Sequence, residues 1–163
     1  MEDRFPELGS RLLVLYDGRC GLCNRSVRWF LRHDARDRLR FIPSESPRVA
    51  ALLARHGFTS PDLSNGPATI LAVRNPGAPS DGSMSLGWNP GDSGEQVLVR
   101  SPAILAMLRE LPGPWPSLAA LFRLIPRPIR DLGYRFIARI RYRIWGRYDT
   151  CPLPTPAERA RFL

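Results

Sequence analysis

The sequence predicts an α/β domain followed by a basic helical extension, and three observations support this. The chain has 163 residues, about the size of one ordinary domain and enough to bury a core. Hydrophobic residues make up 44% of it and charged residues 24%, as in globular rather than disordered proteins. Short apolar runs alternate with segments of helical periodicity, which indicates strands covered by helices.

The first predicted unit is a strand, a cysteine-bearing turn and a helix. Residues 12–16 form an unbroken apolar run that ends at Asp17, as expected of a strand buried on both faces. Over residues 22–33 the apolar residues recur at helical spacing, with arginines on the other side. The turn between these two elements contains Cys20, and Cys23 follows one helical turn later.

Two further strand and helix signals follow. Residues 39–42 predict a second strand, and Ser46 followed by Pro47 predicts the start of a second helix that Gly57 ends. Residues 68–73 predict a third strand.

The last strand and helix of the domain come after a long loop. Residues 74–94 are rich in Gly, Pro and Ser, and 95–100 predict the fourth strand. Ser101 and Pro102 repeat the cap-plus-proline start of a third helix, which stops near Pro112. The resulting order β-α-β-α-β-β-α is that of a thioredoxin-like domain, which we assign to residues 1–113.

Residues 114–163 predict a basic helical extension packed on this domain. Helical spacing covers residues 117–125 and about 130–145. Ten arginines and three acidic residues lie in 117–163, so this part holds +7 of the formal net charge of +9. Because the positive charge lies mainly in the extension, we expect no nucleic-acid partner.

The second helix of the extension has two distinct faces. Its apolar residues and an arginine row lie on opposite sides: Phe136, Ile137, Ile140 and Ile144 against Arg135, Arg139 and Arg143. The simplest interpretation is packing by the apolar face with a solvated cationic face. The alternative is a non-enzymatic docking surface for an acidic protein, an anionic membrane surface or nucleic acid.

The cysteine pair predicts redox chemistry. A helix N-terminus lowers the pKa of a thiol, so Cys20, just ahead of the helix, is the predicted nucleophile, with Arg19 and Arg25 adding positive charge. Cys23 is expected to be more buried and to act as the resolving thiol. The substrate would be a protein or small-molecule thiol or disulfide, and we expect no cofactor beyond the pair itself. The structural alternative is two cysteines packed in a core.

Two more residues are candidates for this site. Asp17, at the end of the first strand, would accept the proton of Cys23 or serve only as a turn residue. Pro67, just before the third strand, is a candidate cis-proline beside the reactive sulfur that would contact the substrate, although most bonds preceding proline are trans.

A zinc site is a further alternative. Cys151, the third cysteine, would act as another resolving thiol, be inert, or serve as a third metal ligand. His33 and His56 would complete a zinc site only if the extension folded back over the pair. Structural zinc sites usually show a second closely spaced ligand pair, and the sequence contains none, so we predict no metal.

The prediction of the cellular compartment rests on two features that the sequence does not show, a secretory signal and a membrane-spanning segment. The first ten residues are polar and acidic rather than typical of a secretory signal, and no apolar run approaches the roughly 18 residues needed to span a bilayer. Three cysteines are too few for a disulfide scaffold. We therefore expect a cytoplasmic protein without a transmembrane segment, for which peripheral membrane contact stays open.

These residues together resemble the DCC family of predicted thiol-disulfide oxidoreductases. The family's namesake pattern, an aspartate followed by Cys-x-x-Cys, matches Asp17, Cys20 and Cys23. The stretch 134–143, with Gly146-Arg147 and Cys151-Pro152 beyond it, is similar to the family's ending. The resemblance implies a thioredoxin-like fold and dithiol chemistry. Within this ending, an alternative role for Arg139, Arg141 and Arg147 is to reach toward the dithiol and stabilise a thiolate.

Overall fold

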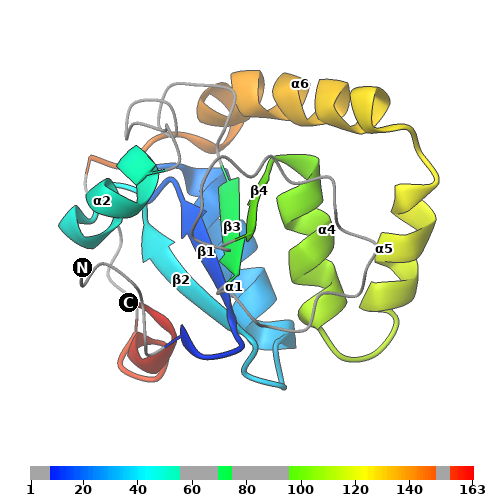
Figure 1. The fold of residues 1–163 in the computed structure, drawn as a ribbon. Helices are drawn as coiled ribbons and strands as arrows, with labels where there is room; N and C mark the ends of the chain where they lie inside the picture. The colour runs from blue at the N-terminus through cyan, green and yellow to red at the C-terminus, as the bar shows by residue number, and fades with distance from the viewer. Residues whose placement is uncertain (1–7, 56–69, 75–95, 150–154) are drawn as a thin grey trace.

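The computed structural model describes residues 8–55, 70–74, 96–149 and 155–163, which form a mixed α/β structure around one sheet (Figure 1). The strands are β1 Leu12–Tyr16, β2 Leu39–Pro43, β3 Ile70–Arg74 and β4 Gln96–Val99. The helices are α1 Gly21–His33, α2 Pro47–Arg55, α4 Ser101–Glu110, α5 Trp115–Arg123, α6 Arg127–Trp145 and the short 3-10 helix η2 Arg159–Arg161.

The sheet has the strand order β2-β1-β3-β4. β1 pairs with β2 in parallel, and β3 runs antiparallel to both of its neighbours. A parallel pair joined by a helix, next to an antiparallel pair, is the topology that the element order predicts. The fold class is therefore confirmed as α/β and consistent with a thioredoxin-like fold.

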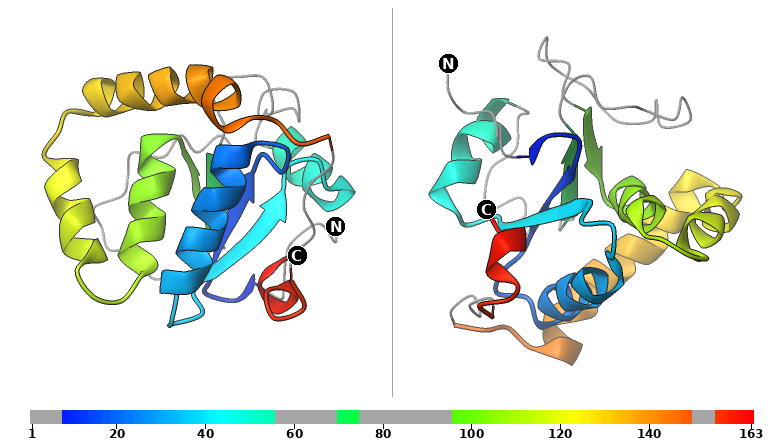
Figure 2. Two further views of the ribbon diagram at one scale, coloured as in Figure 1. Left: turned by 180° about the vertical axis from the view of Figure 1, so that it is seen from behind. Right: turned by 90° about the horizontal axis from the view of Figure 1, so that it is seen from below.

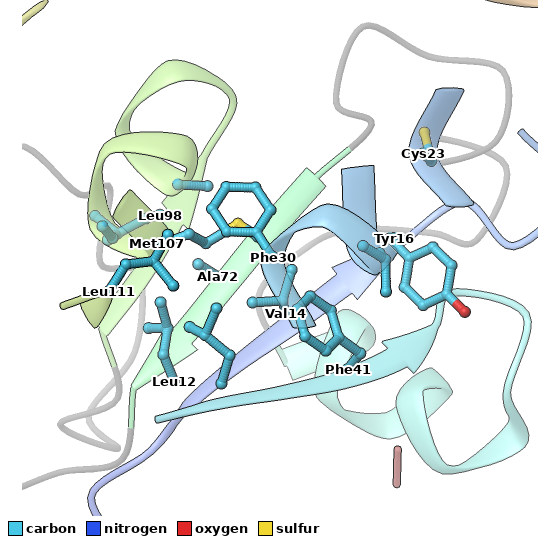
Figure 3. Close-up of a cluster of buried hydrophobic side chains, with 14 of the residues drawn as sticks. Leu12, Val14, Tyr16, Cys23, Phe30, Phe41, Ala72, Leu98, Met107 and Leu111 are labelled. Carbon is cyan, nitrogen blue, oxygen red and sulfur yellow. The ribbon is translucent and has the colours of Figure 1, made fainter. Parts of the chain in front are cut away.

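β1 is buried on both faces, as its unbroken apolar run predicts. Leu12, Val14 and Tyr16 belong to a core cluster with α1 and α4, part of which is drawn in Figure 3. Leu13 and Leu15 belong to a second cluster with α2 on the opposite face of the sheet. Because successive side chains of a strand point to opposite faces, one apolar strand serves both cores.

The remaining strands and α2 lie close to their predicted positions. β2 extends one residue further than predicted, and β3 and β4 fall within the predicted segments, apart from Arg74. Gly57, residues 68–69 and the predicted loop from residue 75 lie outside the described residues.

The start of α4 differs from the prediction. Ser101 is the first helical residue rather than the cap, and Arg100 takes the cap position with a φ of 62°. The Ser101 hydroxyl instead donates a hydrogen bond of 2.5 Å to the Asp131 carboxylate of α6. This serine thus joins two helices.

The extension begins its helices earlier than predicted. α5 starts at Trp115 rather than residue 117, and α6 at Arg127 rather than 130. Both have a proline in the first turn, where its missing N–H costs nothing.

The packing face of α6 also differs from the prediction. α6 runs across the ends of α1 and α4 (Figure 2), yet Phe136 and Ile144 are 64% and 59% exposed. Arg141, by contrast, is 2% exposed. Phe136 and Ile144 of the predicted apolar face therefore point away from the domain, whereas Ile137 lines a cavity between α6 and the domain. The reason is the buried Asp17 carboxylate beneath α6, which pairs with Arg141.

Candidate active site

The two cysteines lie at the start of α1, directly after the turn that leaves β1. Cys20 is the N-cap, and its sulfur accepts a hydrogen bond of 3.3 Å from the backbone N–H of Cys23. Both are thiols. The cysteine thus takes the place that serine or aspartate usually fills at a helix start.

Asn24 fixes the shape of this turn. Its side-chain amide donates to the carbonyl oxygens of Gly18 at 2.7 Å and Cys20 at 3.0 Å. The sequence did not indicate Asn24 as part of the site. Its only signal was a polar side chain on the inward side of an amphipathic helix.

The two thiols have opposite pKa shifts. A hydrogen bond from the Cys23 thiol lowers the pKa of Cys20 to about 7, against the effect of burial, and the Cys23 backbone N–H and the Arg141 charge lower it further. The pKa of Cys23 is raised far above its usual range by its hydrogen bond to Cys20 and by burial. The two thiols are therefore unequal, and of the pair it is Cys20 that has the lowered pKa.

The predicted difference in burial is wrong. Cys20 is 0% exposed and Cys23 is 4% exposed, so neither sulfur is open to solvent. The segment after α6 covers Cys20: Arg147 forms a β-bridge with it, and the Tyr148 N–H donates to the Arg19 carbonyl at 2.8 Å. The sequence did not indicate this cover, because it is made by backbone groups.

Gly21 permits the close approach of this segment. Its N–H donates to the Gly146 carbonyl at 3.3 Å. A Cβ at this position would collide with the carbonyl oxygen of Trp145, which is backbone and cannot swing aside. The residue after the first cysteine is therefore restricted to glycine in this packing.

Asp17 is fully buried beside the dithiol. One carboxylate oxygen accepts the Arg19 N–H at 3.0 Å, which is the turn role that the sequence allowed. The other oxygen pairs with Arg141 Nη2 at 3.1 Å and accepts a short hydrogen bond from the Tyr142 hydroxyl. The negative charge of Asp17 also raises the pKa of both cysteines, so the carboxylate acts on the thiols electrostatically.

Arg141 is the cation of this site. Arg19, Arg25 and Arg139 are exposed, whereas Arg141 is buried and its charge lowers the pKa of both thiols. Arg141 is thus the arginine of the extension whose buried side chain lies at the dithiol, and its role in stabilising a thiolate stays a prediction.

Tyr142 completes the group and was missed as a site residue. It receives a hydrogen bond of 2.7 Å from Arg141 Nη2 and donates to Asp17. Burial and the Asp17 charge raise the pKa of its phenol. Arg147 lies over its ring, 5.4 Å from the centroid. The signal for Tyr142 in the sequence was its position as an aromatic residue next to Arg141, which faces inward in the structure.

A cavity of about 350 Å³ opens beside Cys23. Its walls are mainly apolar and come from α1, β3, α4 and α6, including Leu22, Ile70, Ile104 and Trp145, with the Arg141 side chain as a charged element. The cavity can hold an apolar group next to the dithiol.

His33 takes no part in this site. It is the last residue of α1, about 20 Å along the helix from Cys20 at 1.5 Å per residue. Its ring stacks on Trp29 at 4.2 Å, and its Nδ1 pairs with the Trp29 carbonyl at 2.7 Å. Within the described ranges, no three His, Cys, Asp or Glu side chains are grouped to hold a metal. His56, Pro67 and Cys151 lie outside these ranges.

None of the helices in residues 8–55, 96–149 and 155–163 has both the length and the apolar character needed to cross a bilayer.

Comparison with known proteins assigns the chain to a family. A family model described as DCC1-like thiol-disulfide oxidoreductase matches residues 14–147. The uncharacterized protein YuxK of Bacillus subtilis is 32% identical over 93% of both chains. A chloroplastic DCC family protein of Arabidopsis thaliana is 29% identical over 91% of this chain and 73% of its own length. No solved structure matches significantly. The chain belongs to the DCC1-like thiol-disulfide oxidoreductase family.

Proposed function

We propose that the chain is an enzyme that exchanges thiols and disulfides, with Cys20 as the nucleophile and Cys23 as the resolving thiol. The observation that supports this most is the N-cap position of Cys20, where hydrogen bonds from Cys23 and the charge of Arg141 lower the pKa of the thiol to about 7. Near neutral pH a large fraction of Cys20 is then thiolate, the form that attacks a disulfide.

In the first step the Cys20 thiolate attacks one sulfur of a substrate disulfide. A bond forms between Cys20 and that sulfur, the substrate disulfide breaks, and the other substrate sulfur leaves as a thiolate. Forming the mixed disulfide removes the negative charge from Cys20. The hydrogen bond that Cys20 received from the Cys23 thiol is lost as well, which removes the main cause of the raised pKa of Cys23.

In the second step Cys23 loses its proton and attacks the Cys20 sulfur. The Cys20–Cys23 disulfide forms and the substrate leaves as a second thiolate, so two electrons pass from the dithiol to the substrate. We assign the proton of Cys23 to the Asp17 carboxylate, which raises the pKa of Cys23 while it is charged. Protonation of Asp17 removes this opposing charge as the Cys23 thiolate appears.

Substrate access requires the segment over Cys20 to move. The contacts to be broken are the hydrogen bonds from Gly21 to Gly146 and from Tyr148 to Arg19. Both are backbone bonds at the start of α1, and each contributes on the order of 1 kcal/mol. Opening this segment by breaking these two bonds is therefore a rearrangement of low energy.

The test is a trapping experiment in a Cys151→Ser background, so that alkylation and mass measurements report only the pair. Each single variant, Cys23→Ser and Cys20→Ser, is mixed with glutathione disulfide, and the adduct is measured against pH. We expect the Cys23→Ser variant to form a glutathione adduct at Cys20, faster as the pH rises through the pKa of Cys20. The Cys20→Ser variant is the matched control and should react far more slowly.

Two outcomes would contradict the proposal. If Cys23 forms the faster adduct, the roles are reversed and the cavity beside Cys23 is the entrance. If neither cysteine forms an adduct, and the double-thiol protein forms no internal disulfide in a glutathione redox series, the pair is structural.

A further inference from the structure

The exposed apolar side chains of this protein are gathered in one region. Among the described residues, every large hydrophobic side chain that is strongly exposed lies between residues 121 and 148, on α5, α6 and the segments that follow them. Six of these are between 59% and 79% exposed and define the α5–α6 apolar face: Leu121, Leu124, Ile129, Leu132, Phe136 and Ile144. Single exposed apolar residues are ordinary, but Ile129, Leu132 and Phe136 follow one another at helical spacing along α6, and a group of this kind marks an interaction site.

A row of positive charge runs beside this face, and not on the opposite side of the helix as predicted. Arg135, Arg139 and Arg143 are exposed and stand four residues apart along α6, so they form one line on the helix surface. Each of these arginines is followed in the sequence by an apolar residue: Phe136, Ile140 or Ile144. The apolar residue lies about 100° further around the helix than the arginine before it. Residues 115–149 contain eight arginines and two aspartates. The outer side of α6 is therefore apolar along one strip and cationic along the next.

We propose that the α5–α6 apolar face binds the surface of a bilayer that contains anionic phospholipid. The apolar side chains would enter the boundary between headgroups and acyl chains, and the long arginine side chains would reach the phosphates from the side. Each arginine near an anionic surface adds a favourable electrostatic contribution. The helices lie along the surface, since none in the described part of the chain meets the requirements for crossing a bilayer.

The positive charge of this face favours an anionic bilayer over a second copy of the chain as its partner. A symmetric dimer through the same face would bring two arginine rows together, and like charges repel. An anionic bilayer can pair with both the apolar side chains and the arginines. Its acyl region accepts the six apolar side chains, and its phosphates provide negative charge along the whole arginine row.

Docking in this way would place the dithiol near the bilayer. An apolar hollow of about 370 Å³ between α4, α5 and α6 opens beside the same face. Ile104, Tyr134 and Ile137 line both this hollow and the cavity beside Cys23. Membrane docking requires no redox chemistry, so this proposal and the proposed oxidoreductase function are tested independently.

The test is co-sedimentation of the full chain with vesicles of phosphatidylcholine alone or of phosphatidylcholine mixed with phosphatidylglycerol. We expect binding to the mixed vesicles that weakens with salt, and little binding to phosphatidylcholine. The triple variant R135Q/R139Q/R143Q should bind on the order of 100-fold more weakly, from about 1 kcal/mol per arginine. The variant L132S/F136S tests the apolar contribution and should also lose most of its binding.

The matched control is the triple variant R28Q/R32Q/R36Q. These arginines are also exposed, but they lie on α1 and the loop that follows it, so the same loss of net charge occurs away from the proposed face. This control should keep most of the binding.

Three outcomes would overturn the proposal. One is equal weakening by the two arginine triples, which would indicate nonspecific charge attraction. The second is binding that L132S/F136S leaves unchanged. The third is a dimer in solution that L132S/F136S dissociates, which would assign the face to a second copy. Circular dichroism confirms that each variant is folded, and the Cys20→Ser variant should bind like the unmodified chain.

Discussion

Two buried aspartates lie at opposite ends of α1, and each forms an ion pair with an arginine from the C-terminal part of the chain. Asp17, before the helix, is 0% exposed and pairs with Arg141 at 3.1 Å. Asp34, after the helix, is 1% exposed and pairs with Arg161 at 3.3 Å. The two sites thus begin from the same elements, a buried carboxylate and a guanidinium.

The other partners of these carboxylates differ. Asp34 accepts backbone hydrogen bonds of 3.0 Å from both Arg38 and Leu39, and so closes the turn from α1 into β2. Asp17 accepts one backbone hydrogen bond from the described residues, that of Arg19, while its second oxygen is held by the Tyr142 and Arg141 side chains next to the thiols. A carboxylate held by backbone fixes the fold. A carboxylate held by side chains beside two thiols is placed to take up or release a proton when a thiol loses or gains one.

The largest expected difference concerns the arginines. Arg141→Met would leave the Asp17 carboxylate buried without its cation, which costs about 3–5 kcal/mol of the free energy of unfolding. Arg161→Met is the matched variant. The Arg161 side chain is 27% exposed and Asp34 keeps two backbone donors, so we expect a loss of only about 1 kcal/mol. Urea unfolding of the reduced proteins measures both values. Equal losses would mean that the two ion pairs are equivalent supports of the fold.

The second difference concerns the chemistry of the carboxylates. Asp17→Asn removes the proposed proton acceptor, so release of substrate from the mixed disulfide should slow by about 100-fold, the usual effect of losing a general base. Asp34→Asn should leave this rate unchanged and lower only the free energy of unfolding. Both rates are measured in single turnovers with preformed glutathione adduct in the Cys151→Ser background.

The pH dependence separates this role from a purely electrostatic one. The Asp17 charge raises the pKa of both thiols, so Asp17→Asn should move the pKa of Cys20 below about 7 and extend its reactivity to lower pH. If resolution also becomes faster in this variant, Asp17 acts only by opposing the Cys23 thiolate and is not a base.

The sequence predicted those features that depend on neighbouring residues. The apolar run of β1, the amphipathic α1 and the place of Cys20 at its start are local, and the structure contains all three. The packing of α6 is not local. The prediction assumed that the apolar residues of α6 face the domain. In the structure several of these residues lie on the outward side of the helix.

What determines the inward side of α6 is a charge far away in the chain. Asp17 and Tyr142 are 125 positions apart, and a buried carboxylate directly after β1 requires a cation and a hydrogen-bond donor from the element that packs over it. The burial of Cys20 escaped prediction for a similar reason. Its cover consists of the backbone of residues 146–148, and the sequence indicates where side chains prefer to lie, not which backbone will cross a site.

The smallest expected effect is that of Tyr142→Phe. This change removes the hydroxyl that donates to Asp17 and keeps the ring, over which the guanidinium groups of Arg141 and Arg147 lie at 4.4 and 5.4 Å. Because Arg141 still holds the same carboxylate oxygen, we expect a loss of about 1–2 kcal/mol in the free energy of unfolding and less than about a tenfold change in the rate of resolution. Tyr148→Phe, at a tyrosine that is 44% exposed, is the matched control and should change neither quantity. A loss from Tyr142→Phe as large as that from Arg141→Met would mean that the phenol, rather than the guanidinium, is the main support of the buried Asp17 charge.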